Sequence, residues 1–105
     1  MKPERAGRFD ATELDDVVHG RVRLGIMAYL VGAGAADFVT LKEHLRTTNG
    51  NLSVHLGKLE DAGYITLERS IVDKRTRTTV APTKAGRSAL RAYVRRMAAL
   101  VEQLG

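Results

Sequence analysis

The middle of the chain places its apolar residues first with the period of a helix and then with that of a strand. Leu52, Leu56 and Leu59 recur at i, i+4 and i+7, which makes one narrow apolar stripe. Gly63 follows the last turn and supplies the left-handed conformation that ends many helices. The pattern therefore predicts an amphipathic helix over about residues 49–62.

A shorter helix is expected just before this one. The order of a capping box appears in Thr40-Leu41-Lys42-Glu43, so we expect a helix that begins at Leu41 with Leu41 and Leu45 facing inward. Residues that tolerate turn geometry then follow in Thr47-Thr48-Asn49-Gly50. Either threonine can cap the second helix.

Two strand patterns follow the second helix. Residues 64–69 alternate apolar and polar side chains, and residues 76–80 are rich in β-branched ones. Turn chemistry and positive charge coincide between them at Asp73-Lys74-Arg75. We therefore expect a hairpin with a basic tip, and a brief strand at Phe38-Val39 would complete its sheet.

Core helices are expected on the N-terminal side. The apolar run from Leu24 to Ala36 holds 13 residues, too few for the roughly 20 that span a bilayer, so we interpret it as a core helix. Before it, Leu14, Val17 and Val18 predict an amphipathic turn or helix. Residues 1–10 contain no apolar run, so we expect a flexible arm and neither a signal peptide nor a membrane anchor.

The C-terminal stretch predicts a long helix with one apolar seam. Thr83, just after Pro82, is a candidate cap for it. The seam has spacings of 4, 3, 4 and 3 and consists of Leu90, Val94, Met97, Val101 and Leu104. We expect it to pack on the chain's own residues 14–30 on one side and on a second subunit on the other.

The face of the 49–62 helix opposite the leucines is small, polar and largely uncharged. With about 100° per residue, it carries Gly50, Val54, Gly57 and Asp61, and Asn51, Ser53 and Lys58 lie on its flanks. Two glycines inside a helix cost roughly 1 kcal/mol each against alanine. Either they sit against the preceding helix or a turn, or this face enters a DNA major groove, about 12 Å wide, where small residues fit; we favour the second.

Composition agrees with a polyanionic partner. The 105 residues suit one domain, and 17 Lys and Arg against 12 Asp and Glu give a net charge of +5 and a pI near 10.0. The absence of cysteine excludes disulfides and thiolate metal sites, and it suits a reducing cytoplasm.

No residue pattern predicts an enzyme, a cofactor or a metal. The three histidines, His19, His44 and His55, lie on separate predicted elements, and no nucleophile motif is present. We expect His55, beside the leucine stripe, to pack or to contact a phosphate. The five aromatic residues form no stacking pair on a strand, which argues against a single-stranded RNA platform.

These elements together resemble a known family. The helix contains Leu-Ser-x-His-Leu-x-x-Leu-Glu-x-x-Gly, and the basic hairpin is followed by Pro82-Thr83-Lys84-Ala85-Gly86-Arg87. Over about residues 14–100 the chain resembles the small MarR- and ArsR-like winged helix-turn-helix transcriptional regulators. The resemblance implies an α+β fold, mainly α, with a two-stranded wing and a long C-terminal helix.

The resemblance also implies a function. Such proteins are cytoplasmic homodimers that bind palindromic operators in double-stranded DNA, with a recognition helix, here about 49–62, in the major groove. The wing, here about 70–79, lies on the backbone or in the minor groove. The resemblance therefore divides the chain into three expected parts: a flexible arm over 1–10, a DNA-binding domain over 11–83 and a dimerisation helix over 84–105. Larger members add a ligand crevice, so the resemblance leaves a small-molecule effector open without supporting one.

The site residues follow from the surface pattern and the resemblance together. The expected DNA-binding residues are Thr48, Asn49, Asn51, Ser53, Val54, Lys58, Lys74, Arg75 and Arg77, and the expected dimerisation residues are the five of the C-terminal seam. Asn49 and Asn51 suit an adenine edge, although near a helix start they also suit free backbone N–H groups. A repressor is expected. The alternatives are a winged helix that binds protein and an architectural DNA binder without sequence preference.

Overall fold

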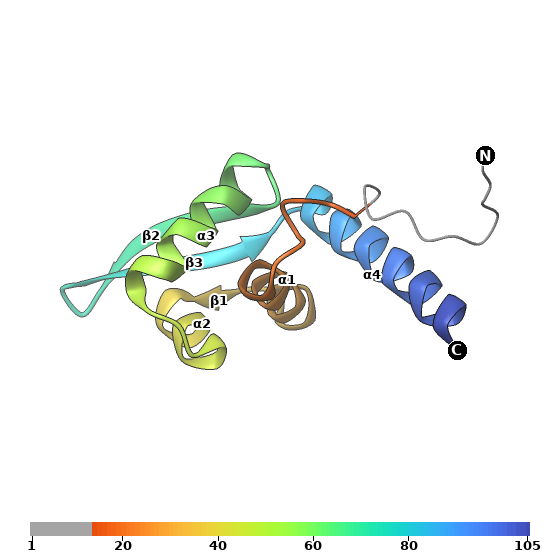
Figure 1. The fold of residues 1–105 in the computed structure, drawn as a ribbon. Helices are drawn as coiled ribbons and strands as arrows, with labels where there is room; N and C mark the ends of the chain where they lie inside the picture. The colour runs from red at the N-terminus through yellow and green to blue at the C-terminus, as the bar shows by residue number, and fades with distance from the viewer. Residues whose placement is uncertain (1–13) are drawn as a thin grey trace.

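The structure of the protein is a computed structural model, in which residues 14–105 are described. The predicted arm over 1–10 lies outside these residues. Within them the chain forms α1 (Arg21–Ala33), β1 (Ala36–Asp37), α2 (Phe38–Leu45), α3 (Asn49–Asp61), β2 (Ile65–Val72), β3 (Arg75–Pro82) and α4 (Lys84–Leu104), as Figure 1 shows. The fold is mainly helical with one small sheet, which confirms the predicted winged helix-turn-helix.

The sheet is antiparallel, with its strands in the order β1-β3-β2. Val72 pairs with Arg75, so a two-residue turn joins β2 to β3. Asp73 and Lys74 in this turn have φ angles of 52° and 65°, and positive φ at both positions is typical of the type I′ turn that matches the twist of a hairpin. The predicted hairpin is confirmed, and its strands extend beyond the predicted segments.

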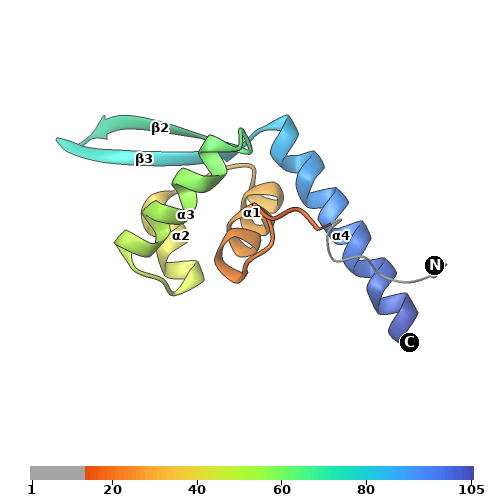
Figure 2. The ribbon, with the colours of Figure 1, turned by 45° about the horizontal axis from the view of Figure 1, so that its top comes forward.

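The hydrophobic core lies between the first three helices and the sheet. Figure 2 shows α1, α2 and α3 on one side of the β2–β3 hairpin, with α4 running away from them. The fully buried side chains come from every layer and include Val18, Ile26, Met27, Leu30, Leu41, Leu52, Leu59, Ile65 and Val80. The leucine stripe of α3 is therefore buried as predicted, and none of the described helices is long and apolar enough to cross a bilayer.

The start of α2 differs from the prediction. The helix begins at Phe38, because the Asp37 carboxylate accepts a hydrogen bond of 2.8 Å from the Thr40 backbone N–H and acts as the N-cap. This bond is the main cause that lowers the pKa of Asp37. Aspartate is a stronger N-cap than threonine, so Thr40 is not the cap and the predicted strand at Phe38-Val39 is wrong. The short strand lies two residues earlier, where Ala36 pairs with Val80.

The turn before α1 is held by side-chain hydrogen bonds. The Asp15 carboxylate accepts from the backbone N–H groups of Val17 and Val18 at 2.8 and 3.1 Å, which confirms the predicted turn. Its other oxygen accepts from the Tyr64 hydroxyl, and this bond is the main cause that raises the pKa of Tyr64 to about 12. The turn is thereby fastened to the start of the hairpin.

The junction between α3, the hairpin and α4 is tight. Thr83 caps α4 by accepting from the Gly86 N–H at 3.0 Å, and its hydroxyl donates to the Gly63 carbonyl at 2.6 Å. Gly63, with φ of 79°, makes the left-handed turn after α3, as predicted. A Cβ atom at Gly86 would lie 2.1 Å from the Tyr64 carbonyl oxygen, so only glycine fits there.

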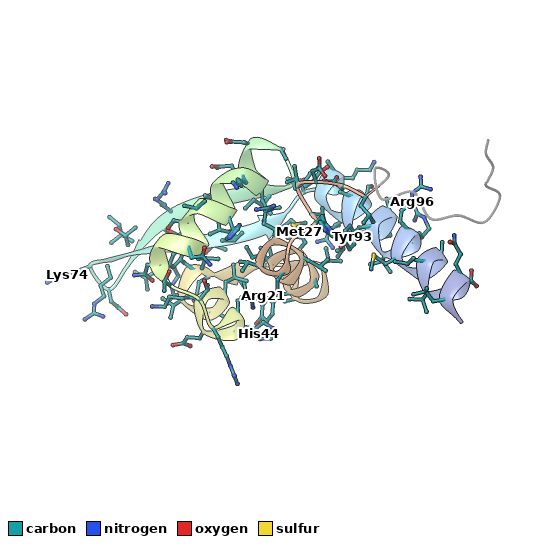
Figure 3. All side chains as sticks on the ribbon, in the orientation of Figure 1. Arg21, Met27, His44, Lys74, Tyr93 and Arg96 are labelled. Atoms are coloured by element: carbon teal, nitrogen blue, oxygen red, sulfur yellow. The ribbon has the colours of Figure 1, made fainter. Side chains whose placement is uncertain are left out.

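The seam of α4 divides into two parts. Leu90 and Tyr93 are buried in the same hydrophobic core as Met27 of α1, and Figure 3 labels Tyr93 and Met27. Tyr93 was not part of the predicted seam, and its hydroxyl also bonds His19 Nδ1 at 2.8 Å. Self-packing thus ends near Met97, and the second half of α4 extends beyond the domain with Val101 and Leu104 exposed.

Gly86→Ala should destabilise the protein by about 1–3 kcal/mol, because the added methyl group overlaps backbone that cannot move without shifting β2. Urea unfolding measures the change. Gly57→Ala is the matched control: no atom lies within 4 Å of its added Cβ, so this helical substitution should stabilise by about 0.5–1 kcal/mol. A Gly86→Ala protein as stable as the unmodified one would contradict the tight junction.

Candidate nucleic-acid interface

The outer face of α3 is open. Val54 is 57% exposed on the side opposite the buried leucines. Apart from the adjacent residues and the backbone of α3 itself, no atom lies within 4 Å of a Cβ atom built on Gly50 or Gly57, so within residues 14–105 neither glycine sits against another segment. The structural alternative for these two glycines is therefore wrong, and the small outer face is accessible to a large partner.

The first turn of α3 is organised by two threonines. Thr48 is the N-cap, and its hydroxyl accepts from the Asn51 backbone N–H at 3.1 Å. The Asn51 side chain donates through Nδ2 to the Thr47 hydroxyl at 2.7 Å. Asn51 therefore caps no backbone group, and its Oδ1 accepts from none of the described residues. The amide is held in one orientation at the exposed end of the helix.

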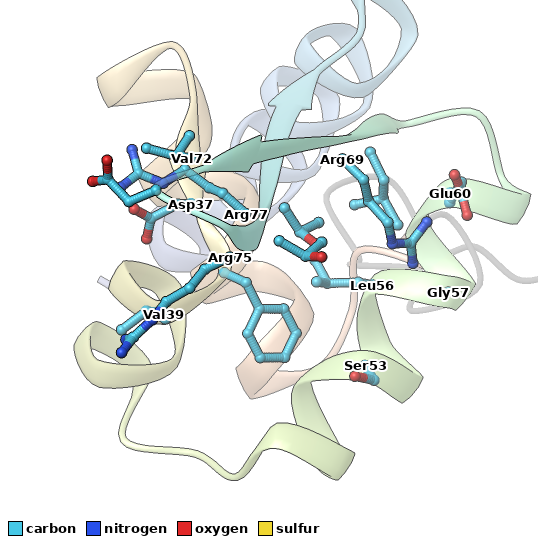
Figure 4. Close-up of a pocket in the computed structure, with 15 residues that line it drawn as sticks. Asp37, Val39, Ser53, Leu56, Gly57, Glu60, Arg69, Val72, Arg75 and Arg77 are labelled. Atoms are coloured by element: carbon cyan, nitrogen blue, oxygen red, sulfur yellow. The ribbon is translucent and has the colours of Figure 1, made fainter.

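A groove with a volume of about 1100 Å³ lies between α3 and the hairpin. Figure 4 shows Ser53, Gly57 and Glu60 along α3, with the hairpin and its arginines across the groove. The lining arginines are Arg69, Arg75 and Arg77. The α3 wall thus carries two small residues, Ser53 and Gly57, and the carboxylate of Glu60, and the hairpin wall carries three guanidinium groups. Asp37 and Asp73 also line the groove.

The hairpin extends this cationic wall to its tip. Lys74, at the far end in Figure 3, is exposed, as are Arg75 and Arg77. Arg77 lies near Asp37, whose pKa it helps to lower after the larger effect of the Thr40 hydrogen bond. Lys74 and Arg75 donate hydrogen bonds to none of the described residues, so their cationic groups are available to a partner.

The opposite flank of α3 holds a contact that the sequence did not predict. Arg23 NH1 lies 2.9 Å from His55 Nδ1, and Arg23 Nε donates to the Val17 carbonyl at 2.6 Å. Burial is the main cause that lowers the pKa of His55, followed by the charges of Arg23 and Lys58. No local pattern joins residues 23 and 55, because the contact depends on how α1 packs on α3.

Seven of the nine predicted DNA-binding residues fall into three groups, and the other two, Val54 on the outer face of α3 and Lys74 at the hairpin tip, are exposed. Ser53, Arg75 and Arg77 line one groove. Thr48, Asn49 and Asn51 lie at the exposed first turn of α3. Lys58 lies on the other flank, near His55, and does not share the groove with the hairpin arginines.

Comparisons with known proteins agree with this geometry. Residues 22–101 match the model of a family described as winged helix DNA-binding domain. An uncharacterized protein of Methanocaldococcus jannaschii is 40% identical over 73 residues, which cover 70% of this chain and 79% of that protein. The structure of a transcriptional regulator homologue from Pyrococcus horikoshii OT3 is similar with a TM-score of 0.79 and 32% identity, over 84% of this chain and 87% of the other. A MarR-family regulator from Silicibacter pomeroyi shares the fold, with a TM-score of 0.61 and 22% identity over 88% of this chain and 59% of its own.

Acid should destabilise the protein through His55. Its pKa is lowered by folding, so the unfolded chain binds the proton at higher pH than the folded one. The stability that the neutral ring contributes is complete above pH 6.5, the ordinary histidine value, and is lost as the pH falls through 6.5 toward the lower folded value. Urea unfolding between about pH 8 and about pH 5.5 should show a smaller loss for His55→Asn than for the unmodified protein. Equal losses would contradict the assignment.

Proposed function

Because the chain belongs to the family of winged helix DNA-binding domains, we propose that it reads a palindromic operator in double-stranded DNA as a homodimer. Its fold and relatives are those of a winged-helix transcriptional regulator of the MarR type. The observation that carries the proposal is the open, small-residue face of α3 beside a groove with a cationic wall. The function is binding, and operator occupancy represses transcription in the cytoplasm.

Base recognition is assigned to the exposed part of α3. The Asn51 amide, oriented by Thr47, presents Oδ1 and one N–H to an adenine edge, and Asn49 is exposed two residues earlier. Ser53 suits several bases, and the exposed Val54 side chain suits a thymine methyl group. These groups together fit a major groove that admits one helix.

Phosphate contact is assigned to the residues around this face. Lys74, Arg75 and Arg77 follow the backbone beside the hairpin, and Lys58 serves the other side of α3. The Thr48 hydroxyl accepts from a backbone N–H and retains its own proton for donation to a phosphate. These contacts set register and carry no sequence information.

Dimerisation is assigned to the second half of α4. Val94, Val101 and Leu104 are 54%, 63% and 81% exposed, and they continue the seam that Leu90 begins in the core. A second copy that covers them would remove this apolar surface from water. A two-fold dimer would also present two α3 helices about one DNA turn, ~34 Å, apart, as a palindrome requires.

Asn51→Ala combined with Ser53→Ala should weaken operator binding about ten- to a hundredfold, because contacts to base edges are lost. The operator is first obtained by sequencing genomic fragments that the purified protein retains at near-physiological salt. The double variant should keep its affinity for unrelated duplexes, which fluorescence anisotropy measures. Retention of fragments without a shared motif would favour an architectural binder, and no retention would favour a protein-binding module.

Arg75→Ala is the matched control for phosphate contact. It should weaken binding to all duplexes alike and lower the slope of log K against log salt by about one unit, since one fewer counterion is released. An unchanged slope would remove Arg75 from the phosphate contacts, whereas a loss confined to the operator would make it a base-reading residue.

Val101→Glu combined with Leu104→Glu should convert the dimer to monomers. Both side chains are exposed within one chain, so the charges leave the domain's own fold intact. Sedimentation should fall from twice 11.5 kDa to 11.5 kDa, with circular dichroism unchanged. A variant that remains a dimer would place the interface elsewhere.

A further inference from the structure

The His55 ring is held in a defined protonation state. Arginine has donors and no acceptor, so the 2.9 Å contact between Arg23 NH1 and His55 Nδ1 requires Nδ1 to accept. A neutral ring that accepts at Nδ1 carries its proton on Nε2. Within residues 14–105 no group accepts from Nε2, so this N–H is a donor without a partner in the chain.

The ring is also held in position. Besides Nε, which bonds the Val17 carbonyl, Arg23 NH2 donates to the His19 carbonyl at 3.3 Å. The turn that carries these carbonyls is fastened by Asp15 to the Tyr64 hydroxyl. Arg23 therefore links this turn to α3 through hydrogen bonds. Because this link holds the His55 ring in place, His55 loses little side-chain freedom when a partner binds it.

His55 lies on the flank of α3 that faces away from the hairpin. With about 100° per residue, Asn51, His55 and Lys58 fall on one side of the leucine stripe. Ser53, Gly57 and Glu60 fall on the other side and line the hairpin groove, as Figure 4 shows. A helix in the major groove is bordered by two phosphate backbones, and the hairpin reaches only one of them.

We propose that His55 donates its Nε2–H to a phosphate of the DNA backbone on the side of α3 away from the wing, with Arg23 as its positioning residue. This inference rests on the proposed binding of duplex DNA and adds a second backbone contact to it. Burial, followed by the charges of Arg23 and Lys58, the cationic groups that face the ring, lowers the pKa of His55 in the free protein. A phosphate at Nε2 would stabilise the charged ring, so binding takes up a proton as the pH falls. The charged ring no longer accepts from Arg23 at Nδ1, and Arg23 then keeps its hydrogen bonds to the Val17 and His19 carbonyls.

His55→Asn separates this role from packing. The Asn Oδ1 occupies the place of Nδ1 and accepts from Arg23, whereas nothing replaces Nε2–H. At about pH 8 the variant should bind all duplexes about tenfold more weakly, with an unchanged salt slope because the lost donor is neutral. His44→Asn is the matched control, since His44 lies on α2 and packs on Tyr29 with ring centroids 4.6 Å apart. It should bind as the unmodified protein does.

The pH profile distinguishes a phosphate contact from a structural role. From about pH 8 to about pH 6, the affinity of the unmodified protein should rise more than that of His55→Asn. If His55→Asn and the unmodified protein bind with equal affinity at both pH values, or if their affinities change in parallel with pH, the phosphate contact is overturned while the proposed function stays intact. If the unmodified protein binds no duplex, both the phosphate contact and the proposed function are wrong.

A second measurement holds even if His55→Asn does not fold. Nuclear magnetic resonance of the imidazole nitrogens in the unmodified protein should show the proton on Nε2 and a His55 pKa that rises when a duplex is added. A proton on Nδ1, or a pKa unchanged by DNA, would overturn the contact.

Discussion

The burial of three leucines fixes which face of α3 the protein presents. Leu52, Leu56 and Leu59 are almost fully buried, and each contributes about 1.5–3 kcal/mol relative to an exposed side chain. Rotation of α3 by one residue, about 100°, would expose this stripe and turn Ser53, Gly57 and Glu60 into the core in its place. The outward face of α3 is therefore fixed by the burial of the leucines on its opposite face. The outward residues contribute little to folding, so they can be small and polar, and they can include glycines that disfavour a helix.

The ends of α3 fix where this face lies relative to the rest of the molecule. Thr48 caps its start, and Gly63 turns the chain directly into the hairpin. Gly86 then lets the first turn of α4 contact the Tyr64 backbone, so the start of α4 is tied to the end of α3. In the proposed dimer formed through α4, this junction would determine the spacing between the two copies of α3.

Local patterns predicted most of the fold, because most elements here have local causes. The stripe of α3, the Thr83 cap and the hairpin tip each depend on residues within one or two turns of each other. The start of α2 was misplaced because two cap candidates stand three residues apart and the stronger, Asp37, precedes the capping box.

The helical periodicity of the sequence predicted which face of α3 points outward, but it did not predict the side-chain contacts of the site. The outward face of α3 follows from its period, but the bond from Asn51 to Thr47 and the open space around Gly57 depend on side-chain and tertiary placement. The contacts His55–Arg23, Tyr64–Asp15 and His19–Tyr93 join residues 32, 49 and 74 positions apart, and no local pattern signals them. Such contacts arise from helix packing, which a single sequence does not display.

The central claim is that the outer face of α3 and the hairpin form one DNA-contacting surface. The most direct test is a titration of the isotope-labelled protein with duplex DNA, followed by amide resonances along the chain. The account predicts shifts in the first half of α3, at Gly57 and at the hairpin tip around Lys74, with the last turns of α4 unaffected. Shifts confined to α4, or an α3 whose resonances do not move while DNA binds, would contradict it.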